Sequence, residues 1–220
     1  MVDWGEIFTD PEMQRLKPNP ELLTLLPLMK KAGCRLVLDA GCGAGRHLLP
    51  LALAGFLAWG VDREVVVLQA LNARLKSEGA PAHLAHLARA DLRRLPFLPA
   101  SFDLAVSINA INHGDTQTFK DYCRELDRVL MPGGHLFIYT SPREAGERVR
   151  LPQTLELEPD TLVDIATPDG NLVHHFPTPE ELKAQFPQYQ IHRWETVLAP
   201  IPFMGDAKLP QLIFWAQKHG

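Results

Sequence analysis

The chain has 220 residues, of which 46% are hydrophobic, and a formal net charge of −4 at pH 7. This length and composition predict one soluble globular domain, and the mildly acidic charge disfavours a broad nucleic-acid or membrane surface. No apolar run is long enough to span a membrane, and the N-terminus lacks a secretory signal pattern. The three cysteines lack metal-site or redox spacing, so we expect reduced thiols and a cytoplasmic location.

The N-terminal part, residues 1–32, is expected to form an arm followed by a helix over Pro20–Lys31. The arm either covers the mouth of a pocket or packs on the core as an apolar tail. From residue 33 to 140, strands and helices alternate, which is typical of an α/β sheet covered on both faces. We expect strands at Leu36–Asp39, Phe56–Val61, Leu84–Ala90, Phe102–Ile108 and His135–Thr140, and helices at Arg46–Ala54, Glu64–Ser77 and Thr116–Leu130.

Three features define the C-terminal third. Pro132-Gly133-Gly134 predicts a turn before the fifth strand. Residues 141–177 form the least regular segment, and their apolar patches favour an ordered, lid-like insertion. Residues 178–220 begin with a helix whose N-cap is Thr178, and end in two antiparallel strands at Gln190–Ala199 and Gln211–Gln217.

The stretch from Leu36 to His47 is the most informative part of the sequence. An apolar run ends at Asp39 and is followed by glycines at alternate positions, namely Gly41, Gly43 and Gly45. Glycines allow a tight turn and let a ligand lie against bare backbone. The free N–H groups of a following helix favour a carboxylate or phosphate. We therefore expect a small polar cofactor near residue 40.

The residues around this turn separate two classes of cofactor. A dinucleotide site usually has Gly-x-Gly-x-x-Gly, but Arg46 stands where its third glycine would be. Asp62, after the second strand, suits the two vicinal hydroxyls of a ribose. Asp39 would repel a pyrophosphate and attract an ammonium or sulfonium group, which favours an amino-acid-bearing nucleoside.

These residues resemble the class I S-adenosylmethionine-dependent methyltransferases. Leu95–Val106 is similar to that family's loop into the fourth strand, and Arg128–Leu136 to its junction with the fifth strand. The resemblance runs in order from Gly33 to Thr140. The Arg46-His47 pair and the chain length look closest to small bacterial tellurite-resistance-type and ubiquinone-biosynthesis-type members. The family resemblance implies a single domain, residues 1–220. Its sheet would be doubly wound and Rossmann-like, with seven mostly parallel strands and an antiparallel edge.

The resemblance also implies contacts to S-adenosyl-L-methionine. Asp39 and the backbone of Gly41, Cys42 and Gly43 would hold the methionine moiety, and Asp62 the ribose hydroxyls. For the rest of the cofactor it implies adenine contacts from Arg63, Asp91 and the backbone of Leu92, with Ser107 and Asn109 on the sulfonium side. Arg63 departs from the family, which commonly has an apolar residue there.

No catalytic residue follows from this resemblance, because methyl transfer needs mainly alignment and a dry site. A base is needed only if the acceptor must lose a proton. His113 is a candidate base, with a structural role as the alternative, and His174 and His175 are further candidates. We expect no metal site, because adjacent residues of an extended segment, such as His174 and His175, point to opposite faces.

The acceptor is expected to be a small molecule, with neither a nucleic acid nor a membrane as partner, and the chain to be a monomer or homodimer. After the fourth strand, Ser107–Ala110 lacks the Asn/Asp-Pro-Pro-aromatic motif of enzymes that methylate nucleobase or glutamine amino groups. Two alternatives stay open. One is an oxidoreductase with a nicotinamide cofactor, and the other is a non-catalytic cofactor-binding protein of the same fold.

Overall fold

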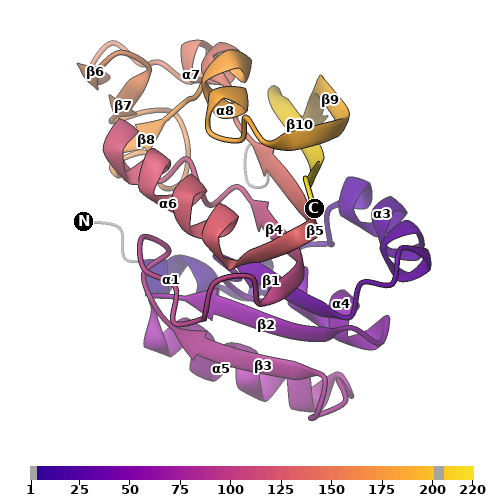
Figure 1. The fold of residues 1–220 in the computed structure, drawn as a ribbon. Helices are drawn as coiled ribbons and strands as arrows, with labels where there is room; N and C mark the ends of the chain where they lie inside the picture. Colours follow the sequence, from indigo (N-terminus) through magenta and orange to yellow (C-terminus); the bar gives the residue numbers. More distant parts are fainter. Residues whose placement is uncertain (1–3, 201–205) are drawn as a thin grey trace.

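The computed structural model describes residues 4–200 and 206–220, whose strands form a seven-stranded sheet and a three-stranded sheet (Figure 1). The strand order of the large sheet is β3-β2-β1-β4-β5-β10-β9. Its strands are β1 (Leu36–Ala40), β2 (Leu57–Asp62), β3 (Ala85–Arg89), β4 (Phe102–Ile108), β5 (Leu130–Thr140), β9 (Tyr189–Pro200) and β10 (Lys208–Lys218). The five strands from β1 to β5 are parallel, and β10 is antiparallel to both β5 and β9. The predicted fold class is therefore confirmed.

Side chains alternate between the two faces of the sheet, so each strand contributes to two hydrophobic clusters. One face is covered by α3 (Pro20–Lys31), α4 (Leu48–Leu53) and α5 (Val65–Ser77), and the other by α6 (Thr116–Val129) and α8 (Pro179–Ala184). Within β1, Val37 belongs to the first cluster and Leu38 to the second. The chain order switches direction between β1 and β4, and open α/β sheets bind ligands beyond the carboxyl ends of the strands at such a point.

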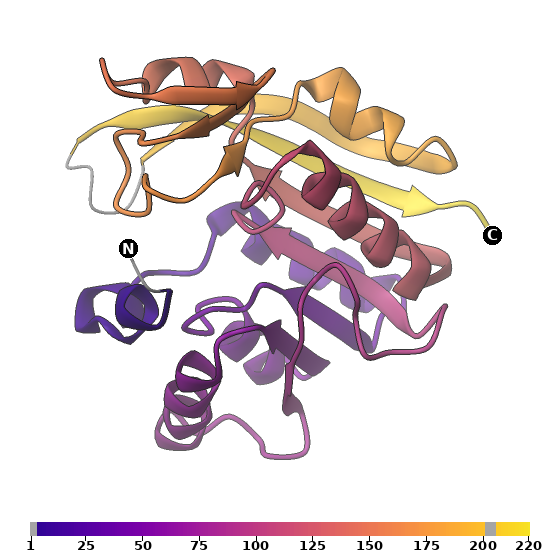
Figure 2. The same ribbon diagram turned by 90° about the vertical axis from the view of Figure 1, so that its left-hand side faces the viewer.

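Two short helices, α1 (Trp4–Thr9) and α2 (Pro11–Gln14), precede this framework. Figure 2 shows them at the same end of the sheet as the loops of residues 141–177. None of the helices within the described residues is long and apolar enough to cross a membrane.

Two elements differ from the sequence prediction. The helix expected from Arg46 begins at Leu48 and has six residues, with His47 at its N-cap. The turn expected at Pro132–Gly134 is instead a bulge inside β5, because Phe102 pairs with Leu130 while Leu104 pairs with His135. The glycines let the extra residues bulge out without ending the strand, and Gly133 has a φ of +78°.

Residues 141–177, expected to be the least regular part of the chain but an ordered insertion, contain several short regular elements. They contain α7 (Arg143–Arg148) and the small antiparallel sheet of β6 (Leu155–Glu158), β7 (Thr161–Val163) and β8 (His174–His175). These strands are too short to leave a periodic pattern in the sequence. A separate cluster of buried side chains holds the segment together: Ala145, Val149, Leu162, Ile165, Phe176 and Leu209.

Candidate functional site

The glycine turn after β1 lies against β2 and the loop after β4. The backbone N–H groups of Gly41 and Cys42 both donate to the carbonyl of Val61, at 2.9 Å. Gly41 and Gly43 have φ values of +78° and +47°. A Cβ on Gly41 would lie 2.5 Å from the Cβ of Ala110. Only glycine therefore fits at position 41, which brings bare backbone to the switch point of the sheet.

Asp62 joins the end of β2 to this turn. Its Oδ2 accepts a hydrogen bond from the N–H of Gly43 at 3.0 Å, and its Oδ1 accepts one from the N–H of Glu64 at 3.1 Å. Each carboxylate oxygen can accept a second hydrogen bond, so two positions stay open for the hydroxyls of a ligand. The two backbone bonds fix the direction in which the carboxylate points.

Asp39 lies under the turn, at the end of β1, and is 1% exposed. Its Oδ2 has no hydrogen-bond partner within the described residues. Burial raises the pKa of Asp39 to about 7 against the opposing charge of Arg46, and Asp62 adds to the rise. A ligand ammonium near this carboxyl would supply the missing partner and favour its ionised form.

Asp91 follows β3 and is engaged by a neighbour that the sequence did not suggest. The side chain of Arg93 donates to both carboxylate oxygens, at 2.6 to 3.1 Å, and the backbone N–H of Arg93 donates to Oδ1. These hydrogen bonds hold the pKa of Asp91 below its usual value. Any ligand bond to Asp91 must therefore share a carboxylate that already forms an ion pair.

Two neighbouring cavities open beside the turn. The carboxylate cavity is lined by Asp62 and Asp91, together with Arg63, Leu92 and Tyr122. The histidine cavity is lined by His113 and His174, together with Arg46, Asn112 and Asp169. The residues that line both cavities are Phe8, Gly41, Asn109 and His113. The two cavities are therefore adjacent, with the glycine turn and the loop after β4 between them.

The two polar residues predicted at the end of β4 lie in different places. Asn109 lines both cavities and has a φ of +51°. Ser107 is fully buried within the sheet, and within the described residues it lines neither cavity. The side chain of Ser107 thus does not reach the ligand space seen here, whereas Asn109 does.

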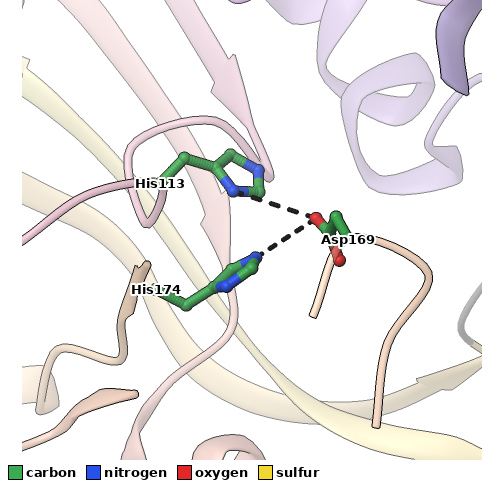
Figure 3. Close-up of side chains that lie close together, drawn as sticks. All are labelled: His113, Asp169 and His174. Atoms are coloured by element: carbon green, nitrogen blue, oxygen red, sulfur yellow. Dashed lines mark hydrogen bonds and ion pairs between the residues drawn. The ribbon is translucent and has the colours of Figure 1, made fainter. Parts of the chain in front are cut away.

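A cluster of three polar side chains forms one wall of the histidine cavity (Figure 3). His174 Nε2 lies 3.2 Å from Asp169 Oδ2, and His113 Nδ1 lies 3.9 Å from the same oxygen. Burial and the neighbouring His174 lower the pKa of His113 to about 4, so this ring is neutral at pH 7. Although burial acts to raise it, the hydrogen bond with His174 holds the pKa of Asp169 below its usual value.

His175 points away from this cluster, as expected for the neighbour of His174 in an extended segment. Its Nδ1 lies 2.9 Å from Thr161 Oγ1, and its Nε2 lies 3.1 Å from a carboxylate oxygen of Glu181. The expectation of no metal site rested on this adjacent pair alone. His174 instead meets His113 and Asp169, which the spacing along the chain did not indicate.

Comparison with known proteins places this site in a family. A model of a methyltransferase domain matches residues 37–134, from β1 into β5. A tRNA U34 carboxymethyltransferase of Edwardsiella ictaluri is 33% identical over 128 residues, which cover 58% of this chain and 38% of that protein. A protein of Encephalitozoon cuniculi that is named a methyltransferase is 35% identical over 105 residues, 47% of this chain and 44% of that protein. Residues 37–134 thus carry a methyltransferase domain, in agreement with the class I S-adenosylmethionine-dependent resemblance of the sequence.

The fold of the methyltransferase agrees with this assignment. The crystal structure of an S-adenosylmethionine-dependent methyltransferase from Methanosarcina mazei matches with a TM-score of 0.76 at 22% identity, over 93% of this chain and 99% of that chain. The family expected from the sequence is thus confirmed, and S-adenosylmethionine is the methyl donor of that family. The alignments with the two curated relatives span less than half the length of those proteins.

Some residues of the candidate site were not predicted from the sequence. Tyr122 comes from α6, and Asp169 comes from the 141–177 segment. Neither lies in a motif, and each reaches the site through tertiary packing. Arg46 was quoted for the family resemblance but was not assigned to the site, although it lines the histidine cavity.

Proposed function

We propose that this chain transfers the methyl group of S-adenosylmethionine to a small-molecule acceptor, with the cofactor's nucleoside in the carboxylate cavity and the acceptor in the histidine cavity. The observation that carries the proposal is the joint placement of Asp39, the glycine turn and Asp62. A buried carboxyl with an unpartnered oxygen lies beneath bare backbone, and a second carboxylate is tied to the same turn. This arrangement suits an ammonium at one end of a ligand and a ribose at the other.

Each part of the cofactor has chemically matched neighbours. The open acceptor positions of Asp62 suit the two ribose hydroxyls. Asp91 and the backbone of Leu92 lie further along the same cavity, beside Tyr122, and suit the polar edge and flat face of adenine. The methionine moiety would lie along the turn, with its ammonium near Asp39 and its carboxylate within the reach of Arg46.

The reacting methyl group would lie where the two cavities meet, beside Gly41 and Asn109. The cofactor supplies a methyl group on a positively charged sulfur, which is displaced when an acceptor attacks the carbon. The chain's part is to align the acceptor and exclude water. The ring of Phe8 lines both cavities and is therefore placed to exclude water from the methyl group.

A small acceptor is favoured over tRNA by the shape of the histidine cavity. α1 and α2 contribute Phe8 and Met13 to its wall, while the 141–177 segment contributes Val149, Ile165 and His174. These walls enclose the space beyond the methyl group on two sides. The net charge of −4 also weakens attraction to a polyanion. Because some relatives are named tRNA U34 carboxymethyltransferases, tRNA belongs in the acceptor screen.

Calorimetric titration of the protein with S-adenosylhomocysteine and, separately, with NAD tests the cofactor. We expect one site for S-adenosylhomocysteine and much weaker binding of NAD. Binding of NAD without S-adenosylhomocysteine would support a nicotinamide oxidoreductase instead. A screen of small metabolites and tRNA with methyl-labelled cofactor then tests transfer, and cofactor binding without transfer to any acceptor would favour a non-catalytic protein.

The variant Asp62→Asn tests the ribose contact. Asparagine keeps one oxygen that can accept from Gly43, so the turn should survive while the charged acceptor is lost. A hydrogen bond to a charged group contributes about 1.5–3 kcal/mol, so the affinity for S-adenosylhomocysteine should fall roughly 10- to 150-fold. An affinity within about twofold of the wild type, less than roughly 0.5 kcal/mol, would contradict the assignment. Circular dichroism of both proteins checks that the fold is unchanged.

A further inference from the structure

The cluster of His113, Asp169 and His174 has the arrangement of a metal site in the wall of the histidine cavity. We propose that these three side chains bind one divalent transition-metal ion, with Zn²⁺ as the probe of choice. Two imidazoles and a carboxylate are a donor set that suits zinc and the neighbouring first-row metals. The three ligand atoms, one from each residue, all lie within 4.8 Å of one another.

The hydrogen bond on the far side of the His113 ring fixes which nitrogen can bind an ion. His113 Nε2 lies 2.9 Å from the backbone carbonyl oxygen of Asn109. A carbonyl oxygen only accepts, so Nε2 carries the proton, and in the neutral ring Nδ1 carries the lone pair. That lone pair is on the nitrogen that faces Asp169 Oδ2 at 3.9 Å.

His174 repeats the pattern with its nitrogens exchanged. Its Nδ1 lies 2.9 Å from the carbonyl oxygen of Leu172, to which it donates, and its Nε2 lies 3.2 Å from Asp169 Oδ2. Metal-binding histidines almost always donate their other N–H to a carbonyl or carboxylate, which orients the ring. Both rings of the cluster donate their other N–H to a backbone carbonyl oxygen. The positions of these carbonyls are set by the backbone and do not depend on side-chain rotamers.

When His174 is also neutral, with its proton on Nδ1, electron pairs from three side chains converge on one point. A proton on His174 Nε2 would satisfy the contact of His174 with Asp169, but the lone pair of His113 would still face the same carboxylate oxygen. One cation between the three atoms relieves both contacts. Zinc bonds to nitrogen and oxygen are about 2.0–2.2 Å long, so the side chains must move closer together for all three atoms to bind one ion.

Three protein ligands leave a position open toward the cavity, as in catalytic zinc sites. This step rests on the proposed function: the open position would take an acceptor with a hydroxyl or thiol group. Its proton would leave to water, since a bound metal lowers the pKa of such a ligand. The freed electron pair would form the bond to the methyl carbon, and the carbon–sulfur pair would return to the cofactor's sulfur. His113 lines both cavities, while Asp169 and His174 line only the histidine cavity, so the ion would lie on the acceptor's side of the junction.

Metal binding is tested on the whole chain after treatment with a chelator. Zn²⁺ is titrated in competition with a chromophoric chelator, and Co²⁺ is added separately to record its visible spectrum. We expect one equivalent of Zn²⁺ to bind to the wild type. Loss of a group that hydrogen-bonds to a metal ligand weakens metal binding by up to about 100-fold, and loss of a ligand itself should weaken it at least as much. We therefore expect Asp169→Asn and His174→Gln to bind Zn²⁺ about 100-fold more weakly.

The control is His83→Ala, which removes an exposed histidine outside the cluster and should bind Zn²⁺ as the wild type does. No stoichiometric binding by the wild type, or binding that survives both Asp169→Asn and His174→Gln, would overturn the proposal. If those variants fail to fold, the Co²⁺ spectrum of the wild type decides alone: absorption bands of nitrogen-bound cobalt support the site, and the spectrum of hydrated Co²⁺ overturns it.

Binding of S-adenosylhomocysteine to the metal-free wild type is measured in parallel. Failure of that binding would contradict the proposed function while leaving the metal result unaffected. Failure of Zn²⁺ binding with cofactor binding intact would remove only the metal site. The two proposals can therefore fail separately.

Discussion

The two cavities are built in different ways. The carboxylate cavity takes its two carboxylates from the ends of consecutive strands: Asp62 is the last residue of β2, and Asp91 lies shortly after β3. The histidine cavity combines a residue after β4, His113, with Asp169 and His174 from a segment that has its own small sheet. The first cavity depends on local strand–turn–helix units, and the second depends on how a separate segment docks on them.

The two cavities also differ in how far the methyltransferase domain model covers them. The family model ends at residue 134, before the 141–177 segment begins. The carboxylate cavity, which is the proposed cofactor half, therefore lies mostly within the methyltransferase domain, while the histidine cavity, the proposed acceptor half, takes Asp169 and His174 from outside it. Features that choose the acceptor are expected in the second half, where the cluster of His113, Asp169 and His174 lies.

The largest expected effect is on the free energy of unfolding, and it shows whether the 141–177 segment is as firmly packed as the sheet. Phe176 is 4% exposed and belongs to the segment's own hydrophobic cluster. Phe176→Ala leaves a cavity, and such changes in a packed core cost about 3–5 kcal/mol. We expect a loss of that size in the free energy of unfolding, measured by urea denaturation, with faster amide exchange across the segment.

The matched control is Leu157→Ala in the same segment, where the side chain is 57% exposed. It should change the free energy of unfolding by less than about 0.5 kcal/mol. If Phe176→Ala costs less than about 1 kcal/mol, the segment is loosely held and the two halves differ in stability as well as in origin.

The second effect concerns Asp39, whose buried carboxyl lies at the end of β1, beneath the glycine turn. Its pKa is about 7 in the folded chain against 3.8 when unperturbed, so between these values the folded state binds more protons than the unfolded state. This contribution is fully present below about pH 4 and is lost as the pH rises to about 7. Each pKa unit corresponds to about 1.4 kcal/mol, so the difference between 3.8 and about 7 makes the loss on the order of 4 kcal/mol.

Asp39→Asn removes this titration while keeping the size of the side chain. At pH 8 and without cofactor, the variant should unfold with a higher free energy than the wild type, and the difference should shrink toward pH 5. Its affinity for S-adenosylhomocysteine should fall, because the ligand ammonium loses a charged partner. Asp164→Asn, at an exposed position, is the control. If the difference in the free energy of unfolding between wild type and variant stays constant from pH 5 to pH 8, Asp39 is already ionised in the folded chain across that range, and the assignment of its pKa is wrong.

The difference between the two cavities also explains which parts of the structure could be predicted from the sequence. The strand ends at Asp39 and Asp62 could be predicted, because each acid directly follows a buried apolar run. The bulge in β5 could not, because Pro132–Gly134 is equally compatible with a turn that ends the strand. The late start of α4 at Leu48 was also missed, since the residues before it, up to His47, belong to the glycine turn.

The histidine cavity was beyond local reasoning for a different reason. His113 and His174 were each singled out in the sequence, but their meeting depends on β8 packing beside the loop after β4. An isolated bridge between these two residues and the hydrogen bond from the N–H of His175 to the carbonyl of Asn112 hold that contact. No spacing along the chain encodes such a pairing, and Asp169 carried no signal at all.

The smallest effect tests whether α1 joins the two halves by covering the cofactor. The ring of Phe8 lines both cavities, and a Cβ on Gly43 would lie 2.9 Å from it, so the ring packs directly on the turn. Phe8→Ala should weaken binding of S-adenosylhomocysteine by about 5- to 30-fold, the equivalent of roughly 1–2 kcal/mol of lost apolar contact. Leu98→Ala, where the side chain is 78% exposed, should leave the affinity unchanged in the same calorimetric titration. Equal affinities for Phe8→Ala and the wild type would mean that the cofactor half closes without α1, and that the helix serves the acceptor half alone.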